Sequence, residues 1–100
     1  MVKHMILWQL DETLTEERKL EVKHGIKEGL EGLLGKIPGL SEIHVYTNGL
    51  PSSNADVMLY SVFKSPEALK NYSLHPAHVA VADSKVRPYT RNRLCLDFEE

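Results

Sequence analysis

The sequence is short of several features that mark specialised classes of protein. Cys95 is its only cysteine, so no intramolecular disulfide can form, and we expect a reduced intracellular thiol buried in a strand. No run of consecutive apolar residues is longer than the four of Met5-Ile6-Leu7-Trp8, whereas a membrane span needs about twenty. No secretory signal is visible. We therefore expect a soluble, cytoplasmic protein with no membrane partner.

An excess of charge of one sign is also lacking. Twelve lysine and arginine residues stand against fourteen aspartate and glutamate residues, which gives a net charge of −2. This balance offers no electrostatic footprint for nucleic acid. Hydrophobic residues make up 42% of the chain and charged residues 26%, values near the globular average that exclude disordered and collagen-like classes. At 100 residues, we expect a single domain over residues 1–100.

A predicted strand over residues 2–10 is followed by a predicted helix. Thr13 and Thr15 compete as its N-cap, because Thr13 has the capping-box spacing to Glu16. Hydrophobic residues then recur every three or four positions, as on one face of a helix: Val22, Ile26, Leu30, Leu33 and Ile37. Gly35 is predicted to end this helix ahead of Pro38-Gly39.

The remaining elements complete a βαββαβ order. They are strands over 42–47 and 55–63, a helical region that begins at Ser65-Pro66, breaks at His75-Pro76 and ends before Pro88, and a strand over 93–98. The link between the two middle strands is too short for a helix, so these strands are expected to pair antiparallel. Two right-handed strand–helix–strand units folded together predict the α+β ferredoxin-like plait, a four-stranded antiparallel sheet with two helices on one face.

Alternation along the strands predicts that both faces of this sheet carry apolar side chains. In the first strand one face holds Val2, His4, Ile6, Trp8 and Leu10, and the other holds Met5 and Leu7. In the last strand Leu94, Leu96 and Phe98 lie on one face and Cys95 lies on the other. Two helices cover only one face, and the simplest cover for the other is a second copy of the chain. We therefore expect a homodimer through the sheet face; the alternative is a sheet with some exposed hydrophobic residues.

Three segments together resemble a known family. They are residues 2–7 at the start, residues 72–79 with a His-Pro-x-His motif at 75–78, and an apolar last strand that ends Leu96-Asp97-Phe98. Over essentially the whole chain the sequence resembles the stress-responsive A/B barrel domain family, abbreviated Dabb. The resemblance implies a ferredoxin-like plait that pairs into a dimeric α/β barrel.

The resemblance also implies candidate site residues. Many Dabb members have no assigned activity, but a plant branch contains polyketide cyclases that close a ring by aldol condensation without a cofactor. Their acid/base tyrosine and histidine match Tyr72 and His78 here, and His4 matches a histidine that lines the same cavity. A further cyclase histidine on the third strand is replaced here by Val57. Wider relatives include cofactor-free monooxygenases that act on quinol-like substrates.

The residue types at these positions fit acid/base chemistry. Histidine titrates near neutral pH, so His78 can take a proton from a carbon beside a carbonyl. Tyr72 can donate a hydrogen bond to the enolate or to the carbonyl under attack, and such a site needs no cofactor. The plainer alternatives are a half-buried His78 that bonds backbone at a helix start, a His75 that caps that helix, and a His4 satisfied in the core.

A metal site is not expected. His75 and His78 are spaced i,i+3 around a proline, whereas the helical histidine pair of zincins is spaced i,i+4. Zinc usually takes three or four protein ligands, so His4 or Asp83 would have to complete the set, and nothing in the sequence requires it.

Two other patterns are assigned structural roles. Gly25, Gly29 and Gly32 lie beside the apolar stripe of the first helix, which favours close packing over room for a ligand tail. Four basic residues within nine positions favour a solvated surface near a helix end, with anion binding as the alternative: Lys85, Arg87, Arg91 and Arg93.

The leading prediction is a small homodimer with a mostly apolar pocket. Its expected lining is Tyr72, His78, His4, His75 and Trp8. We expect it to bind a small hydrophobic or polyketide-like ligand without a cofactor. The main alternative is a cofactor-free enzyme that uses Tyr72 and His78 as acid and base, in cyclase-like aldol chemistry or in quinol-type monooxygenation. A structural assembly without chemistry is the third.

Overall fold

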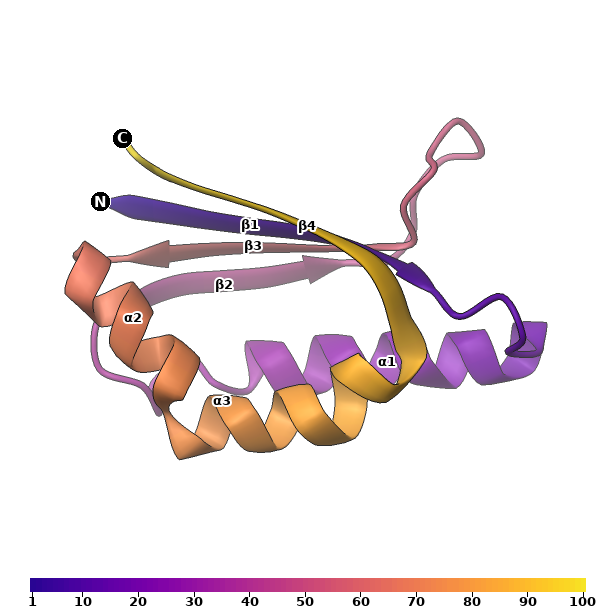
Figure 1. The fold of residues 1–100 in the computed structure, drawn as a ribbon, viewed down its shortest axis with the longest axis horizontal. Coiled ribbons are helices and arrows are strands. Elements are labelled where there is room, and N and C mark those ends of the chain that lie inside the picture. Colours follow the sequence, from indigo (N-terminus) through magenta and orange to yellow (C-terminus); the bar gives the residue numbers. More distant parts are fainter.

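The computed structural model describes all residues 1–100 and joins four strands into one antiparallel sheet. Their order across the sheet is β2 (Leu40–Tyr46), β3 (Val57–Phe63), β1 (Val2–Leu10) and β4 (Thr90–Glu99). The helices lie on one side of this sheet, and the two termini lie side by side (Figure 1). They are α1 (Glu16–Glu31), α2 (Pro66–Leu74) and α3 (Pro76–Val81). The predicted βαββαβ plait is confirmed, with its second helical region divided in two.

The first helix begins and ends at particular side chains. Thr15 is its N-cap and accepts a hydrogen bond from the Arg18 backbone N–H at 3.1 Å, while Thr13 is held by the Asp11 carboxylate instead. The helix ends at Glu31, so the predicted end at Gly35 is wrong. The turns after Gly32 have backbone hydrogen bonds between residues three apart. They still bury Leu33 and Ile37, the last two residues of the apolar stripe.

The second helical region contains two α-helices, as the predicted break at His75-Pro76 implies. Ser65 caps α2 by accepting a hydrogen bond from Ala68 N at 3.1 Å. His75 has an extended backbone (φ −65°, ψ 131°), because the ring of Pro76 disfavours helical geometry in the residue before it. The chain then continues as α3, a π-helical turn over Ala82–Val86 and a short 3-10 turn over Arg87–Tyr89.

The predicted bounds of the strands are corrected by a few residues. β2 starts at Leu40 rather than 42, β3 at Val57 rather than 55, and β4 at Thr90 rather than 93. The last difference reflects a bulge, at which two residues of β4 oppose one residue of β1 and Asn92 takes a positive φ of 54°. The extra residue of a bulge interrupts the alternation of side chains, so the sequence pattern does not reveal the part of the strand before the bulge.

The core lies between the sheet and the helices. The even-numbered residues of β1 are all buried, as the alternation predicts. Phe63 and Ile26 are fully enclosed, and the Ser61 hydroxyl donates to the His4 carbonyl at 3.1 Å. α1 and α3 pack closely, since a Cβ on Gly29 would lie 2.9 Å from Cγ1 of Val81. The prediction that the glycines serve close packing is confirmed at Gly29.

The opposite face of the sheet carries no helix (Figure 1), and several apolar side chains lie on it. In the strand register Met5 lies between Tyr60 and Leu96, and Leu7 lies between Met58 and Leu94. Leu94 and Leu96 are 68% and 64% exposed in the single chain. The prediction of a second, uncovered apolar face is confirmed.

The prediction that the lone cysteine is buried is wrong. Cys95 does lie in a strand, but β4 is at the edge of the sheet and its thiol is exposed, not buried. Edge strands have a neighbour on one side only, so a small side chain there keeps contact with solvent. The structure has no helix with the length and apolar character needed to cross a bilayer.

Candidate functional site

A small cavity lies between β1 and the helices, where several predicted site residues meet. Its volume is about 90 Å³. Side chains from β1, α2 and α3 line it, together with the turn after α3 and the start of β4: His4, Trp8, Tyr72, His78, Arg87 and Arg93 are the ones with chemistry to offer. Four of the five predicted lining residues are therefore brought together. His75 is the exception.

Tyr72 is the most unusual member of this group. It is 1% exposed, and its hydroxyl is buried without any hydrogen-bond partner. The ring packs against Phe63 and His78, with centroids 4.9 Å and 4.3 Å away. Burial raises the pKa of the Tyr72 phenol well above its usual value of 10, so the group is a neutral donor at physiological pH. Leaving such a donor unpaired costs about 1–3 kcal/mol.

His78 is the third residue of α3 and presents one free ring nitrogen. Its Nδ1 lies 3.3 Å from the Ser73 carbonyl oxygen, which can only accept, so we assign the hydrogen to Nδ1. Nε2 then carries a lone pair. Burial lowers the pKa of His78 below its ordinary 6.5, and the nearby positive charge of Arg87 acts in the same direction. At neutral pH the ring is an uncharged proton acceptor beside Tyr72.

His4 enters the cavity from β1 and is 6% exposed. Its Nδ1 is hydrogen-bonded to the carboxylate of Asp97, its direct partner in the register of β1 and β4. The ring meets Phe63 and Tyr72 edge-on at about 6 Å, which fixes its orientation. His4 therefore combines both predicted characters: it is satisfied in the core, and it also lines the cavity.

Asp97 was not singled out from the sequence. It sits among hydrophobic residues in a strand that ends the chain, and nothing local marks it. The alternation of side chains along β4 is the one sequence feature that could have identified Asp97. Leu96 and Phe98 face away from the helices, so Asp97 must point toward the helices, on the same side as the buried face of β1. Only the register of β4 against β1 identifies His4 as its partner.

His75 is placed away from the cavity. Its Nδ1 accepts a hydrogen bond from Ala77 N at 3.1 Å, so the side chain serves as the N-cap of α3. It does not line the small cavity, and its side chain takes the capping role that was named as the alternative. Trp8, in contrast, is 5% exposed and forms part of the cavity wall.

The arginine residues among the four basic residues between positions 85 and 93 have two different roles. Arg91 pairs with Asp11 at 3.1 Å on the surface, as a solvated group would. Arg87 and Arg93 instead line the cavity, although Arg87 is also ion-paired with Asp83. The cavity therefore has two arginine residues in its wall, a feature that the linear pattern did not distinguish from an ordinary charged surface.

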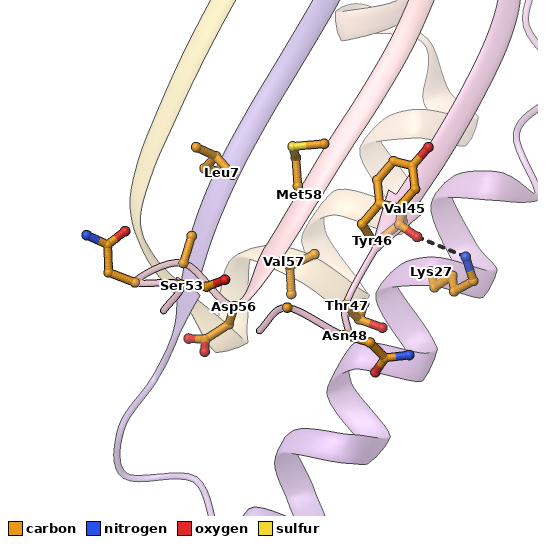
Figure 2. A pocket seen from close by; sticks show the side chains of 13 residues that line it. Leu7, Lys27, Val45, Tyr46, Thr47, Asn48, Ser53, Asp56, Val57 and Met58 are labelled. Atoms are coloured by element: carbon orange, nitrogen blue, oxygen red, sulfur yellow. Dashed lines mark hydrogen bonds between the residues drawn. The ribbon is translucent and has the colours of Figure 1, made fainter. Parts of the chain in front are cut away.

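A larger hollow lies elsewhere, where the loop between β2 and β3 leaves the sheet. It has a volume of about 540 Å³, and Figure 2 shows its wall, which includes Lys27, Tyr46 and Asp56. Lys27 donates to the Val45 carbonyl at 2.8 Å, and the Asp56 carboxylate accepts from Leu10 N at 2.8 Å. Both charged groups thus hold backbone in place, and no predicted site residue lies there.

The small cavity limits what can bind. Pockets for drug-sized ligands usually measure about 300–1,000 Å³, so 90 Å³ accommodates a group of only a few heavy atoms. Within it a neutral phenol donor stands beside a neutral imidazole acceptor, a pair suited to polarising a carbonyl and taking up a proton.

Separately, His4, Cys95 and Asp97 form a group whose side-chain donor atoms all lie within 4.8 Å of one another and could hold a metal ion.

Three solved structures illustrate what the chain resembles. A dimeric protein of unknown function with a ferredoxin-like fold from Bacteroides fragilis is 34% identical, with a TM-score of 0.92, and the match covers 99% of this chain and 95% of that one. A hydroxynitrile lyase from Passiflora edulis is 16% identical, with a TM-score of 0.72 and coverage of 97% and 90%. A putative antibiotic biosynthesis monooxygenase from Nitrosomonas europaea is 11% identical, with a TM-score of 0.75 and coverage of 100% and 98%.

The two enzymes are too distant to show more than the shared fold. No curated protein matches the sequence. The family model described as Stress Responsive A/B Barrel Domain, abbreviated Dabb, matches residues 2–100. The element order, the uncovered apolar sheet face and the Bacteroides relative agree with that match. The chain therefore belongs to the stress-responsive A/B barrel (Dabb) family.

Proposed function

We propose that the small cavity binds a compact hydrophobic molecule that carries a carbonyl group. The observation that carries this proposal is the buried, unpartnered hydroxyl of Tyr72. Buried polar groups nearly always have a partner, so an orphan donor at a cavity wall is a place that a ligand's acceptor would fill. Trp8 and Ile6 supply apolar wall around it. The volume favours the reacting end of a molecule over a whole polyketide.

Binding is tested with two small probes of matched shape. Cyclopentanone offers a carbonyl oxygen to Tyr72, whereas methylenecyclopentane replaces that oxygen by a CH₂ group. We expect the ketone to shift the backbone amide resonances of residues around the cavity and to bind more tightly than the hydrocarbon. Tyr72→Phe should lower ketone affinity about tenfold, the value of one hydrogen bond, and leave the hydrocarbon unaffected.

The matched control is Tyr89→Phe. Tyr89 is also a tyrosine with a contact to another element, since its hydroxyl accepts from Arg18 at 3.0 Å, but it does not line the cavity. Its removal should leave both probes bound as in the parent protein. Equal affinity of the ketone for the parent protein and for Tyr72→Phe would remove the basis of the proposal.

A second function, cofactor-free acid/base chemistry, is favoured by the state of His78. Burial keeps its imidazole neutral near pH 7, and its ring lies 4.3 Å from that of Tyr72. The proposed step is removal of a proton from the carbon beside the bound carbonyl by Nε2 of His78. Tyr72 stabilises the enolate oxygen by hydrogen bonding. Return of a proton to that carbon completes a balanced exchange without any co-reactant.

Hydrogen–deuterium exchange measures this step directly. In D₂O the protein should accelerate deuterium incorporation at the α-carbons of cyclopentanone, as followed by NMR. His78→Gln should abolish the acceleration, while His24→Gln, a change at an exposed histidine of α1, should not. Binding without any acceleration would leave the protein as a binding module and end the enzyme proposal.

We also propose that two copies of the chain associate through their uncovered sheet faces. Support comes from the rows of Met5, Leu7, Leu94 and Leu96 across the strands and from the dimeric Bacteroides relative. Burying such side chains contributes about 25 cal/mol per Å² of apolar surface. In sedimentation experiments Leu96→Lys should shift the protein toward monomer. Leu20→Lys, at an equally exposed leucine of α1, should not. A parent protein that is monomeric throughout the micromolar range would refute this arrangement.

A further inference from the structure

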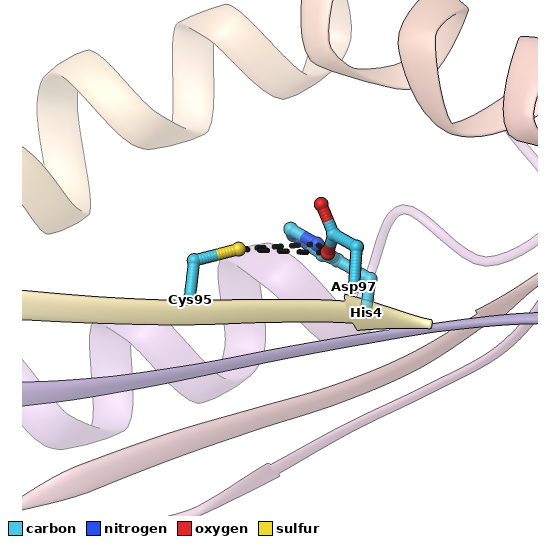
Figure 3. A group of neighbouring side chains, drawn as sticks. All are labelled: His4, Cys95 and Asp97. Atoms are coloured by element: carbon cyan, nitrogen blue, oxygen red, sulfur yellow. Dashed lines mark hydrogen bonds and ion pairs between the residues drawn. The ribbon is translucent and has the colours of Figure 1, made fainter. Parts of the chain in front are cut away.

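Three metal-ligating side chains converge on the helix-facing side of β1 and β4. His4 and Asp97 are direct partners in the strand register, and Cys95 precedes Asp97 by two residues, which puts it on the same face. Figure 3 shows the three side chains standing together above these strands. Their donor atoms, Nδ1, Sγ and a carboxylate oxygen, all lie within 4.8 Å of one another.

The distances suit a single ion of zinc size. Cys95 Sγ lies 3.8 Å from His4 Nδ1 and 3.5 Å from Asp97 Oδ1. A tetrahedral zinc ion with Zn–S of about 2.3 Å and Zn–N or Zn–O of about 2.0 Å would hold sulfur about 3.5 Å from its neighbouring ligands. The hydrogen bond between His4 and Asp97 would open to admit the ion, and Asp97 can move because its side chain is 44% exposed.

We propose that His4, Cys95 and Asp97 form a binding site for a borderline-soft divalent transition ion such as zinc. Imidazole and thiolate disfavour magnesium and calcium, which prefer oxygen ligands alone. Three protein ligands leave the fourth position to water, because the Cys95 thiol is exposed at the sheet edge. The thiolate and the carboxylate together balance the charge of the ion.

The surroundings of His4 already hold the ring in place for ligation. The imidazole is 6% exposed and packs edge-on against Phe63 and Tyr72. A ligand that is oriented before the ion arrives loses little freedom on binding. With Nδ1 bound to the ion, the hydrogen of the neutral ring must reside on Nε2. The site shares His4 with the cavity, but it does not rest on the proposed function, because it needs neither Tyr72 nor His78.

Cobalt and zinc test the site without any assay of activity. Untagged protein freed of metal by a chelator should bind one Co²⁺ per chain, with a thiolate-to-cobalt charge-transfer absorption in the near ultraviolet. Addition of Zn²⁺ should remove this absorption by displacement. Cys95→Ser should abolish the charge-transfer band. Asp97→Asn should weaken zinc binding about tenfold or more, because mutations of even the groups that hold metal ligands in place typically lower metal affinity by that factor.

His44→Gln is the matched control. His44 is paired with a carboxylate in the same strand, Glu42 at 3.0 Å, but has no cysteine beside it. Zinc affinity should be unchanged in this variant. The proposal is overturned if the metal-free parent protein shows no charge-transfer band with Co²⁺. Zinc binding of equal strength in the parent and in Cys95→Ser would overturn it as well, even with both proteins folded.

Discussion

Tyr72 and His78 face each other across the break between α2 and α3, with ring centroids 4.3 Å apart. In one continuous helix, residues six apart would lie on different faces. The extended residue His75, held before Pro76, redirects the chain so that the start of α3 turns its third residue toward the second helix. The proline of the His-Pro-x-His motif thus assembles the cavity, and the first histidine of the motif caps the helix that carries the second.

Removal of the Tyr72 hydroxyl should make the protein more stable. The hydroxyl is buried without a partner, while the ring packs against Phe63 and His78. Tyr72→Phe keeps the ring and deletes the orphan donor, so we expect an increase of about 1 kcal/mol in the free energy of unfolding. Denaturant titration by circular dichroism measures it. A loss of stability would show that the hydroxyl has a partner, such as a buried water.

Stability should fall in acid because of His78. Burial lowers its folded pKa below 6.5, so the unfolded chain binds the proton more readily than the folded one. The contribution of neutral His78 is fully present above about pH 6.5 and is lost as the pH falls through the folded pKa. We expect His78→Gln to lose less stability than the parent protein over that interval. Parallel pH profiles for the two proteins would contradict the assignment.

The outer edge of β2 is closed by side chains of α1, and breaking this closure should destabilise the protein. Glu31 accepts a hydrogen bond from Val45 N at 2.9 Å, and Lys27 donates to the Val45 carbonyl at 2.8 Å. Burial alone would raise the pKa of Glu31, but hydrogen bonds from Lys27 and Val45 outweigh it and keep the carboxylate charged.

Glu31→Ala would leave the Val45 N–H without its partner. We expect a loss of about 1–3 kcal/mol in unfolding experiments. Glu28→Ala provides the comparison, since Glu28 forms only an exposed pair with His24 on the same helix. Its replacement should change stability by less than about 0.5 kcal/mol. Equal effects of the two substitutions would show that the closure of β2 contributes nothing.

The glycines of α1 should respond differently to the same substitution. A Cβ on Gly25 meets only Lys85 Cδ at 3.7 Å, so Gly25→Ala should gain about 1 kcal/mol of helix propensity. A Cβ on Gly29 would lie 2.9 Å from Cγ1 of Val81, a stiff side chain, so Gly29→Ala should lose stability.

Thermal unfolding of the two single variants and of Gly29→Ala combined with Val81→Ala separates the two effects. The double variant should recover part of the loss, because the added methyl group then has room. Stabilisation by both single substitutions would show that α1 and α3 are not in close contact.

Much of the fold is predictable from local pattern. Period-two strands, a period-3.6 stripe, the caps Thr15 and Ser65 and the break at His75-Pro76 each act over a few residues, and the sequence displays them directly. The errors fall where local pattern is weak. Leu33 continues the stripe of α1 and is buried as expected, yet it lies in a turn, because burial of an apolar side chain does not require a helix.

The site was only partly predictable for a different reason. The family resemblance points to Tyr72, His78 and His4, but the Asp97 partner of His4 depends on a pairing between residues 93 positions apart. Exposure of Cys95 depends on the place of β4 at the sheet edge. The orphan state of the Tyr72 hydroxyl is a property of three-dimensional packing alone.

A crystal structure of the protein with cyclopentanone bound tests the central claim most directly. The ketone oxygen should lie within hydrogen-bond distance of the Tyr72 hydroxyl, about 2.7 Å, with its ring against Trp8 and Ile6. A ketone bound elsewhere, with the Tyr72 hydroxyl still unpartnered, would contradict the proposed function.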